Sequence, residues 1–194
     1  DKYLFTATVR ADGSSRFGSD NQYGVFPSAA FAWKINEEGF IGDNVSTLKA
    51  RLSWGITGNQ EGLGYGNFVR RERYAGPGIQ DNGNIDTPGL NAVAFANPDL
   101  QWEETTAYGF GVDFGLAADR LTATFDVYYS ETTNLLLRVE AAQPSPQPFF
   151  FQNLDALVIN QGVEFTVNYD FLINNSDWDW DASFNISYNE NEMQ

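Results

Sequence analysis

Alternation of apolar and polar residues over ten or more positions is the feature that most constrains the fold of this 194-residue chain. Near its end, residues 177–189 read DWDWDASFNISYN. In an extended strand, alternate side chains face opposite sides, so this segment has one apolar face and one polar face. The alternation therefore predicts a β-strand that separates two unlike environments.

The aspartates of this segment also stand two residues apart, as the first ligands of an EF-hand calcium loop do. Such a loop needs glycine at its sixth position and a carboxylate at its twelfth, where this chain has Ala182 and Tyr188. We therefore interpret the segment as a strand rather than as a calcium site.

Six further segments alternate in the same way, at residues 3–9, 25–35, 48–57, 106–117, 121–130 and 162–171. Several of the seven reach the ~9–11 residues of a tilted membrane-spanning strand, whereas strands of soluble proteins average about 5–6. They predict an all-β fold, an antiparallel transmembrane β-barrel of which about seven strands are present. A soluble β-sandwich, which would bury the apolar faces under a second sheet, is the alternative fold.

The connections between these segments are alternately short and long. Short turns are expected at residues 117–120 and 174–177, a medium one at 36–47, and long loops at 57–100 and 137–160. Short periplasmic turns and long extracellular loops are typical of outer-membrane barrels. Trp33, Trp178 and Trp180 adjoin the shorter connections, where an interfacial aromatic girdle is expected.

Composition excludes several classes of function. With 26 acidic and 11 basic residues, the formal charge is −15, which argues against a nucleic-acid partner. The chain has no histidine and no cysteine, so it offers neither a Ser-His-Asp triad nor ligands for a typical zinc site. Neighbouring carboxylates such as Glu103 and Glu104 point apart on a strand, unlike a glycosidase pair. We expect no enzymatic activity, no cofactor and no metal.

Several segments resemble the SusC/RagA family of TonB-dependent outer-membrane transporters. They are DGSSRFG at residues 12–18, YGVFPSAAFAW at 23–33, LKARLSWGITGNQ at 48–60 and the run from Thr105 through Leu137. Residues 160–171 resemble the family's N-K-G-x-E segment, with Gln161 where lysine is usual. The resemblance covers most of the chain, in the family's order and spacing.

The resemblance implies a 22-stranded barrel in the bacterial outer membrane, of which residues 1–194 form part of the C-terminal half. It implies import of oligosaccharides or peptides, powered by the TonB complex, with a SusD-type surface lipoprotein as a lid. The plug domain, TonB box and signal peptide would lie outside these residues, and outer-membrane lipid would surround the barrel. A secreted soluble β-sandwich that binds glycans and a passive porin remain the alternative functions.

Three groups of loop residues are candidates for contacts with a ligand or the lid. Arg70, Arg71 and Arg73 could meet an anionic group, although a solvated loop is the simpler explanation for them. Asn97, Asp99 and Trp102, together with Tyr108 at the loop base, could bind carbohydrate, although Trp102 could equally belong to the girdle. Phe149, Phe150 and Phe151 follow a stretch stiffened by three prolines, and they could either contact the lid or ligand or fold back over the barrel rim.

Four charged residues are expected to face the lumen. They are Lys34, Lys49, Arg51 and Asp126, on the polar faces of the alternating segments. We expect them to shape the field inside the barrel or to contact the plug.

Overall fold

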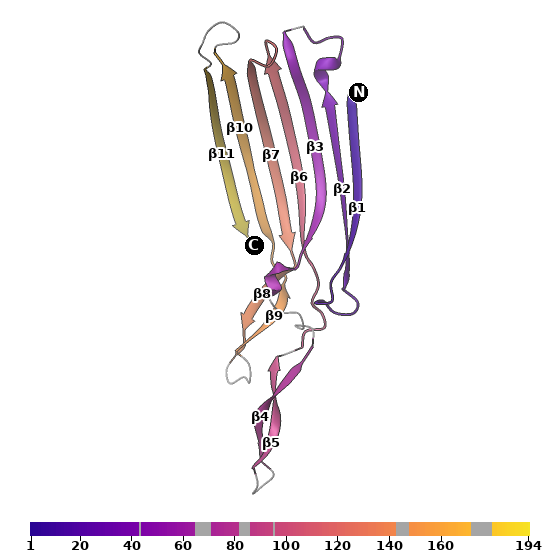
Figure 1. Cartoon of the computed structure of the whole chain (residues 1–194), viewed down its shortest axis with the longest axis vertical. Helices are drawn as coiled ribbons and strands as arrows, with labels where there is room; N and C mark the ends of the chain where they lie inside the picture. Colours follow the sequence, from indigo (N-terminus) through magenta and orange to yellow (C-terminus); the bar gives the residue numbers. More distant parts are fainter. Residues whose placement is uncertain (43, 65–70, 82–85, 95, 143–147, 172–179) are drawn as a thin grey trace.

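Seven long strands form one antiparallel sheet, drawn in Figure 1 as a single layer. The computed structural model describes residues 1–42, 44–64, 71–81, 86–94, 96–142, 148–171 and 180–194. The seven strands have 11 to 15 residues each, which confirms the lengths expected from the alternation. In sheet order they are β1 (Tyr3–Gly13), β2 (Tyr23–Lys34), β3 (Val45–Asn59), β6 (Glu103–Leu116), β7 (Leu121–Thr133), β10 (Val158–Asp170) and β11 (Asp181–Met193).

The long connections contain secondary structure of their own. The connection between β3 and β6 includes a hairpin of β4 (Arg73–Asp81) and β5 (Asp86–Ala94), and the connection between β7 and β10 includes β8 (Leu135–Glu140) and β9 (Phe149–Leu154). Both hairpins extend beyond the same end of the sheet (Figure 1). Two short 3-10 helices, η1 (Ile35–Glu37) and η2 (Glu61–Leu63), complete the described elements. Long segments that the sequence predicted only as loops are therefore partly ordered β-structure.

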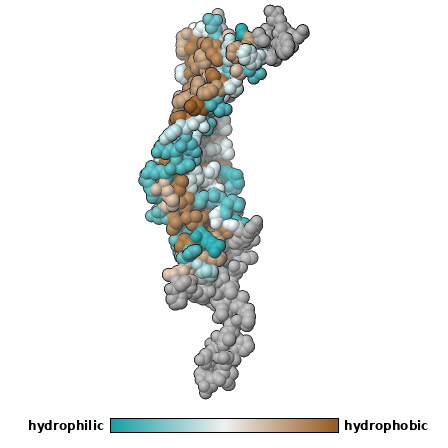
Figure 2. Space-filling model, turned by 90° about the vertical axis from the view of Figure 1, so that its left-hand side faces the viewer, coloured by the Kyte–Doolittle hydropathy of each residue, from teal (hydrophilic) through white to brown (hydrophobic). Residues whose placement is uncertain are grey.

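The register of the strands places apolar residues in rows across one face of the sheet. In one row, every neighbouring pair is matched in register: Phe5, Phe31, Leu52, Phe110, Val127, Val163 and Tyr188. In the side view of Figure 2, apolar residues gather over the part of the strands nearer the short turns. We call the face of the sheet that carries these apolar rows the outer face.

The outer face is not covered by a second sheet. Phe110 and Phe125 are 42% exposed, Phe165 is 38% exposed and Phe184 is 57% exposed. A soluble sandwich would bury all four of these side chains. The exposed, continuous apolar face therefore agrees with the predicted transmembrane barrel sector and argues against the sandwich. Among the described residues, no helix is long and apolar enough to cross a membrane.

Aromatic rings bound the apolar rows of the outer face at both ends. Near the short turns, Tyr3 stacks on Trp33 at 6.2 Å between ring centroids, and Phe171 stacks on Trp180 at 4.4 Å. At the other end, Tyr108 lies 6.5 Å from Tyr129. Such aromatic belts mark the two interfaces of a membrane. Trp178 lies outside the described residues.

The opposite face of the sheet is polar, and we call it the inner face. Ladders of small polar side chains cross it from strand to strand. Asn168 donates to Thr122 Oγ1 at 3.3 Å and accepts from Ser183 Oγ at 2.6 Å, and the hydroxyls of Thr105 and Thr132 lie 2.8 Å apart. These contacts suit a surface that meets water.

The turn between β6 and β7 is short, as the sequence predicted, and its backbone is unusual. Ala117, Ala118 and Asp119 have positive φ angles of 54°, 60° and 63°. Residues other than glycine rarely adopt this region. Asp119 Oδ1 accepts hydrogen bonds from Ser46 Oγ at 2.6 Å and Thr47 Oγ1 at 3.1 Å, so the turn is tied to the start of β3.

Candidate functional site

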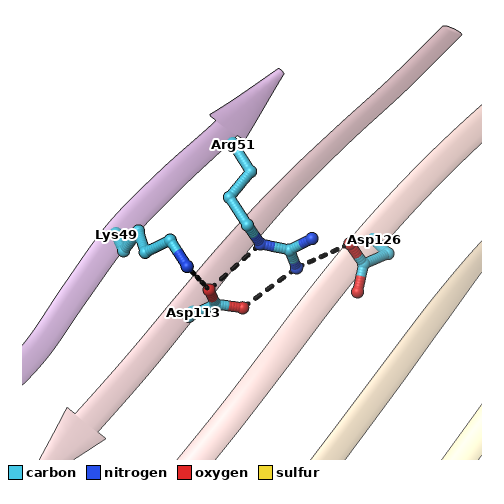
Figure 3. Close-up of polar contacts among 4 residues, drawn as sticks. All are labelled: Lys49, Arg51, Asp113 and Asp126. Atoms are coloured by element: carbon cyan, nitrogen blue, oxygen red, sulfur yellow. Dashed lines mark hydrogen bonds and ion pairs between the residues drawn. The ribbon is translucent and has the colours of Figure 1, made fainter. Parts of the chain in front are cut away.

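A cluster of four charged residues lies on the inner face (Figure 3). Arg51 of β3 donates to both carboxylate oxygens of Asp113 on β6, at 2.9 and 3.0 Å, and to Asp126 on β7 at 2.8 Å. Lys49 Nζ lies 3.4 Å from Asp113. The two positive and two negative charges balance, so this part of the predicted lumen wall is locally neutral.

Gly111 makes this cluster possible, because Arg51 must cross β6 to reach β7. A Cβ atom at position 111 would lie 2.6 Å from Arg51 Nη2 and would also meet Asp126 Oδ1. A cavity of about 330 Å³ adjoins the cluster, and its floor includes Gly109 and Gly111. Because the glycines of β6 have no side chains, they leave space above the β6 backbone for the Arg51 side chain and for this cavity.

Among the described residues, the buried apolar side chains cluster at the long-loop end of the sheet rather than in the sheet itself. The members of this cluster come from the β1–β2 connection, β2, η2, the segment before β6, and β8: Phe17, Phe26, Leu63, Leu100, Trp102 and Leu136. We call it the loop core. It joins three connections that are far apart in the sequence, so the long loops share one anchored base.

Two glycines allow the backbones of these loops to touch. A Cβ atom at Gly18 would overlap the carbonyl oxygen of Pro98, and one at Gly62 would overlap that of Leu136. The Gly18 N–H donates to Leu100 O at 3.2 Å, and Ser14 Oγ donates to Gln60 Oε1 at 2.6 Å. The DGSSRFG and GNQ motifs therefore hold the loop core together.

Strands β2 and β3 separate at the long-loop end, and we call this opening the fork. Their ladder runs from Lys34–Lys49 to Ser28–Gly55 and stops there, although β3 continues to Asn59. Pro27, the next residue of β2, has no N–H to donate to a ladder. The Phe26 ring fills the top of the fork, where a Cβ at Gly58 would overlap it.

The three loop residues predicted to bind carbohydrate have contacts within the protein. Trp102 is 8% exposed and packs against Phe17, with 4.8 Å between the ring centroids. Its Nε1 donates a hydrogen bond to Gln22 O at 3.4 Å. Asn97 donates to Phe151 O at 2.8 Å and accepts from the Asp99 N–H at 3.1 Å. The ring of Trp102 and the amide of Asn97 thus have structural partners, whereas Asp99 is exposed.

The three phenylalanines lie on β9 and are half-buried. Phe149 and Phe151 share one face of the β8–β9 hairpin and meet edge to face at 5.9 Å. Arg138 of β8 places its guanidinium carbon 3.8 Å from the centre of the Phe149 ring, an arrangement that favours cation–π attraction. Sequence reasoning missed Arg138, because its partner on β9 becomes apparent only from the hairpin register.

The predicted basic cluster is only partly described. Arg71 is exposed, and Arg73 is the first residue of β4. Arg70 lies outside the described residues. Any contact of this cluster with a ligand or partner stays a prediction, as do the contacts predicted for the other six residues.

Comparison with known proteins identifies the whole chain with one family model. Residues 1–194 match the model described as TonB dependent receptor-like, beta-barrel. The chain is 41% identical, over its full length, to the TonB-dependent receptor SusC of Bacteroides thetaiotaomicron. It is 40% identical, over 99% of its length, to a TonB-dependent receptor of Formosa agariphila.

Solved structures show the same arrangement of strands. The RagAB peptide transporter matches 98% of the chain with a TM-score of 0.82 and 31% identity, and the RagAB peptide importer in its closed-closed state matches with a TM-score of 0.84. The chain spans about a fifth of each of these relatives, from 18% to 20% of their length. It therefore corresponds to one sector of a larger protein.

Proposed function

Because the chain belongs to the β-barrel family of TonB-dependent receptors, which are outer-membrane proteins, we propose that the whole protein actively imports nutrient oligomers. The imported molecules would be oligosaccharides or peptides, and the TonB complex would supply the energy. Residues 1–194 would form one sector of the barrel wall. The other strands of the barrel would then pair with the free edges of β1 and β11.

The observation that carries this proposal is the contrast between the two faces of one uncovered sheet. An apolar row crosses all seven strands on the outer face, from Phe5 to Tyr188. Charged and hydroxyl-bearing side chains, including Arg51 and Asp126, occupy the inner face. Lipid on one side and an aqueous lumen on the other is the arrangement that satisfies both faces.

We further propose that a SusD-type surface lipoprotein docks on the β8–β9 hairpin. One face of this hairpin packs on the loop core through Leu136 and Phe151. The residues on its other face are apolar apart from Gln152: Leu135, Leu137, Val139, Phe150 and Leu154. A two-stranded hairpin alone is marginally stable in water, so an apolar partner on this second face would stabilise it.

Uptake by cells tests the import proposal. We expect deletion of the gene to abolish growth on one class of oligomer, with glycans and peptides supplied separately as the sole carbon source. Expression of the full-length gene should restore growth, and loss of TonB should prevent that rescue. Rescue without TonB would indicate a passive porin instead. A normal growth rate of the deletion strain on every oligomer would contradict import.

Co-purification tests the lipoprotein proposal separately. Leu137→Glu and Phe150→Glu place charges on the second face of the hairpin, and we expect both to release the lipoprotein from the detergent-solubilised protein. Arg138→Glu, on the face that packs against the loop core, is the matched control for added negative charge near the same hairpin. Retention of the lipoprotein by both of the first two variants would rule out this docking surface.

A further inference from the structure

A groove opens on the inner face beside the fork between β2 and β3, with an apolar part next to Phe26 and a polar part next to Gln60 and Glu61. Two adjoining cavities, of about 240 and 350 Å³, share Arg10, Asp12 and Gly58 among the residues that line them. Their volumes are close to the lower end of the usual range for ligand pockets. The groove runs from hydroxyl-bearing residues such as Thr8 and Ser28, at one end, to Gln60 and Glu61 at the other.

Charged groups of both signs line this groove and have capacity left for a ligand. Arg10 Nε pairs with Asp12, at 2.7 and 2.9 Å from its two carboxylate oxygens, and the Arg10 side chain is 73% exposed. Within the described part of the chain, the terminal nitrogens of Arg10 and the carboxylate of Glu61 have no partner. A guanidinium with two free nitrogens can bind a carboxylate through a pair of parallel hydrogen bonds.

The aromatic residues of the groove offer no surface for stacking. Phe26 is 5% exposed and Trp102 is 8% exposed, because both rings are packed in the loop core. The two aromatic residues that line the groove therefore offer no exposed face on which a sugar ring could stack. A peptide suits the groove better, since its carboxylate and its ammonium or amide groups match the free nitrogens of Arg10 and the carboxylate of Glu61.

We propose that this groove binds an oligopeptide in an extended conformation. A carboxylate of the peptide lies on the free side of the Arg10 guanidinium, and an ammonium or amide group faces Glu61. The side-chain amide of Gln60 donates to a peptide carbonyl, because Ser14 already occupies its oxygen. This assignment rests on the proposed import function and specifies the substrate class.

Binding to the full-length protein in detergent tests the assignment. The probes are a tryptic digest of casein and, separately, maltooligosaccharides of four to seven glucose units, and mass spectrometry identifies what the purified protein retains. A retained peptide is then synthesised and titrated. We expect Arg10→Ala to weaken its binding about tenfold or more, and Arg10→Lys to restore part of it, since lysine keeps the charge but loses the paired geometry.

Two controls separate a binding defect from a folding defect. Lys34→Ala removes a positive charge from the inner face at the short-turn end, outside the groove, and we expect it to bind the peptide as the parent protein does. Thr57→Cys, in a protein freed of any other cysteine, places a thiol in the groove. We expect the bound peptide to slow its reaction with a maleimide.

The other outcomes identify which proposal is wrong. If the protein retains peptides and Arg10→Ala binds them unchanged, the groove is not the site, but import of peptides stands. If the protein retains maltooligosaccharides and no peptide, the peptide assignment is overturned, but import of oligomers stands. If the cells import no oligomer of either class, the import function fails and this inference fails with it.

Discussion

Arg51 lies across the backbone of Gly111 and reaches Asp126, 2.8 Å away on the next strand. The absent side chain at position 111 is therefore part of the ion-pair geometry. Figure 3 shows the guanidinium directed over β6 between the two aspartates. Residues on three neighbouring strands are thereby tied together on the inner face.

Replacing this glycine should disturb the cluster. We expect Gly111→Val to displace Arg51 and to lower the free energy of unfolding by about 1–3 kcal/mol, the usual cost of overpacking. The measurement is the unfolding of the full-length protein in detergent. Gly39→Ala is the control, since a Cβ at that position meets nothing within 4 Å. Equal stability of the two variants would mean that Arg51 does not need the space.

A charged side chain introduced on the outer face should destabilise the protein. Phe125 lies midway along the apolar side of β7, and we expect Phe125→Arg to destabilise the membrane-embedded barrel by about 2–4 kcal/mol. Its neighbour Thr124 points to the inner face, so Thr124→Arg should cost much less. Urea unfolding from lipid vesicles measures both. A larger loss for Thr124→Arg would mean that the two faces have been assigned the wrong way round.

The loop core should be the most sensitive part of the loops. Leu136 is 2% exposed and Leu137 is 41% exposed, although they are neighbours on β8. We expect Leu136→Ala to cost about 2–5 kcal/mol through the cavity it leaves, and to speed proteolysis of the connection between β7 and β10. Leu137→Ala is the matched control and should leave the cleavage rate nearly unchanged. Similar cleavage rates would contradict a shared, anchored base.

Alternation predicted the seven long strands, because each of them separates two environments along its whole length. It did not predict β8 and β9. Leu135, Leu136 and Leu137 are consecutive, and the hairpin carries apolar residues on both of its faces, so no long alternation appears. The hairpin becomes visible only when the loop core, formed by connections distant in the sequence, covers one of its faces.

The candidate sites, like the β8–β9 hairpin, could be predicted only in part from the sequence. The alternation of residues along the strands placed Arg51 and Asp126 correctly on one face, but their contact depends on strand register and on Gly111. Trp102 appeared available to a ligand because it adjoins a loop, and its burial depends on Phe17 and Phe26. The fork was not predicted, although Pro27 carries a local signal for it, since proline cannot extend a ladder.

The turn between β6 and β7 should tolerate glycine better than alanine. Ala118 has a φ of 60°, which costs an alanine roughly 1 kcal/mol relative to glycine. We expect Ala118→Gly to raise the free energy of unfolding by up to about 1 kcal/mol. Ala123→Gly, in the middle of β7, should lower it instead, because glycine weakens a strand interior. Destabilisation by both variants would contradict the turn geometry.

Acid should weaken a contact that joins β1 to the turn after β2. Glu38 accepts hydrogen bonds from Lys2 Nζ at 3.0 Å, Trp33 Nε1 at 3.2 Å and Tyr3 Oη at 3.0 Å. These bonds, that of Lys2 foremost, hold the pKa of the Glu38 carboxyl below its ordinary value of 4.5. The folded protein therefore binds this proton less readily than the unfolded chain does.

A lowered pKa in the folded state means that Glu38 stabilises the protein above its ordinary pKa and loses this effect as the pH falls through the folded-state value. We expect Glu38→Gln to lower the unfolding temperature at pH 7, and we expect this difference to shrink as the pH falls through the folded-state pKa of Glu38, below which both side chains are neutral. High salt should shrink the difference at pH 7, because the Lys2–Glu38 contact is exposed to solvent. Thermal unfolding of the full-length protein in detergent, scanned from pH 7 to pH 3, measures this difference. If it were the same at both ends of the scan, the ionised carboxylate would not be what joins β1 to the turn.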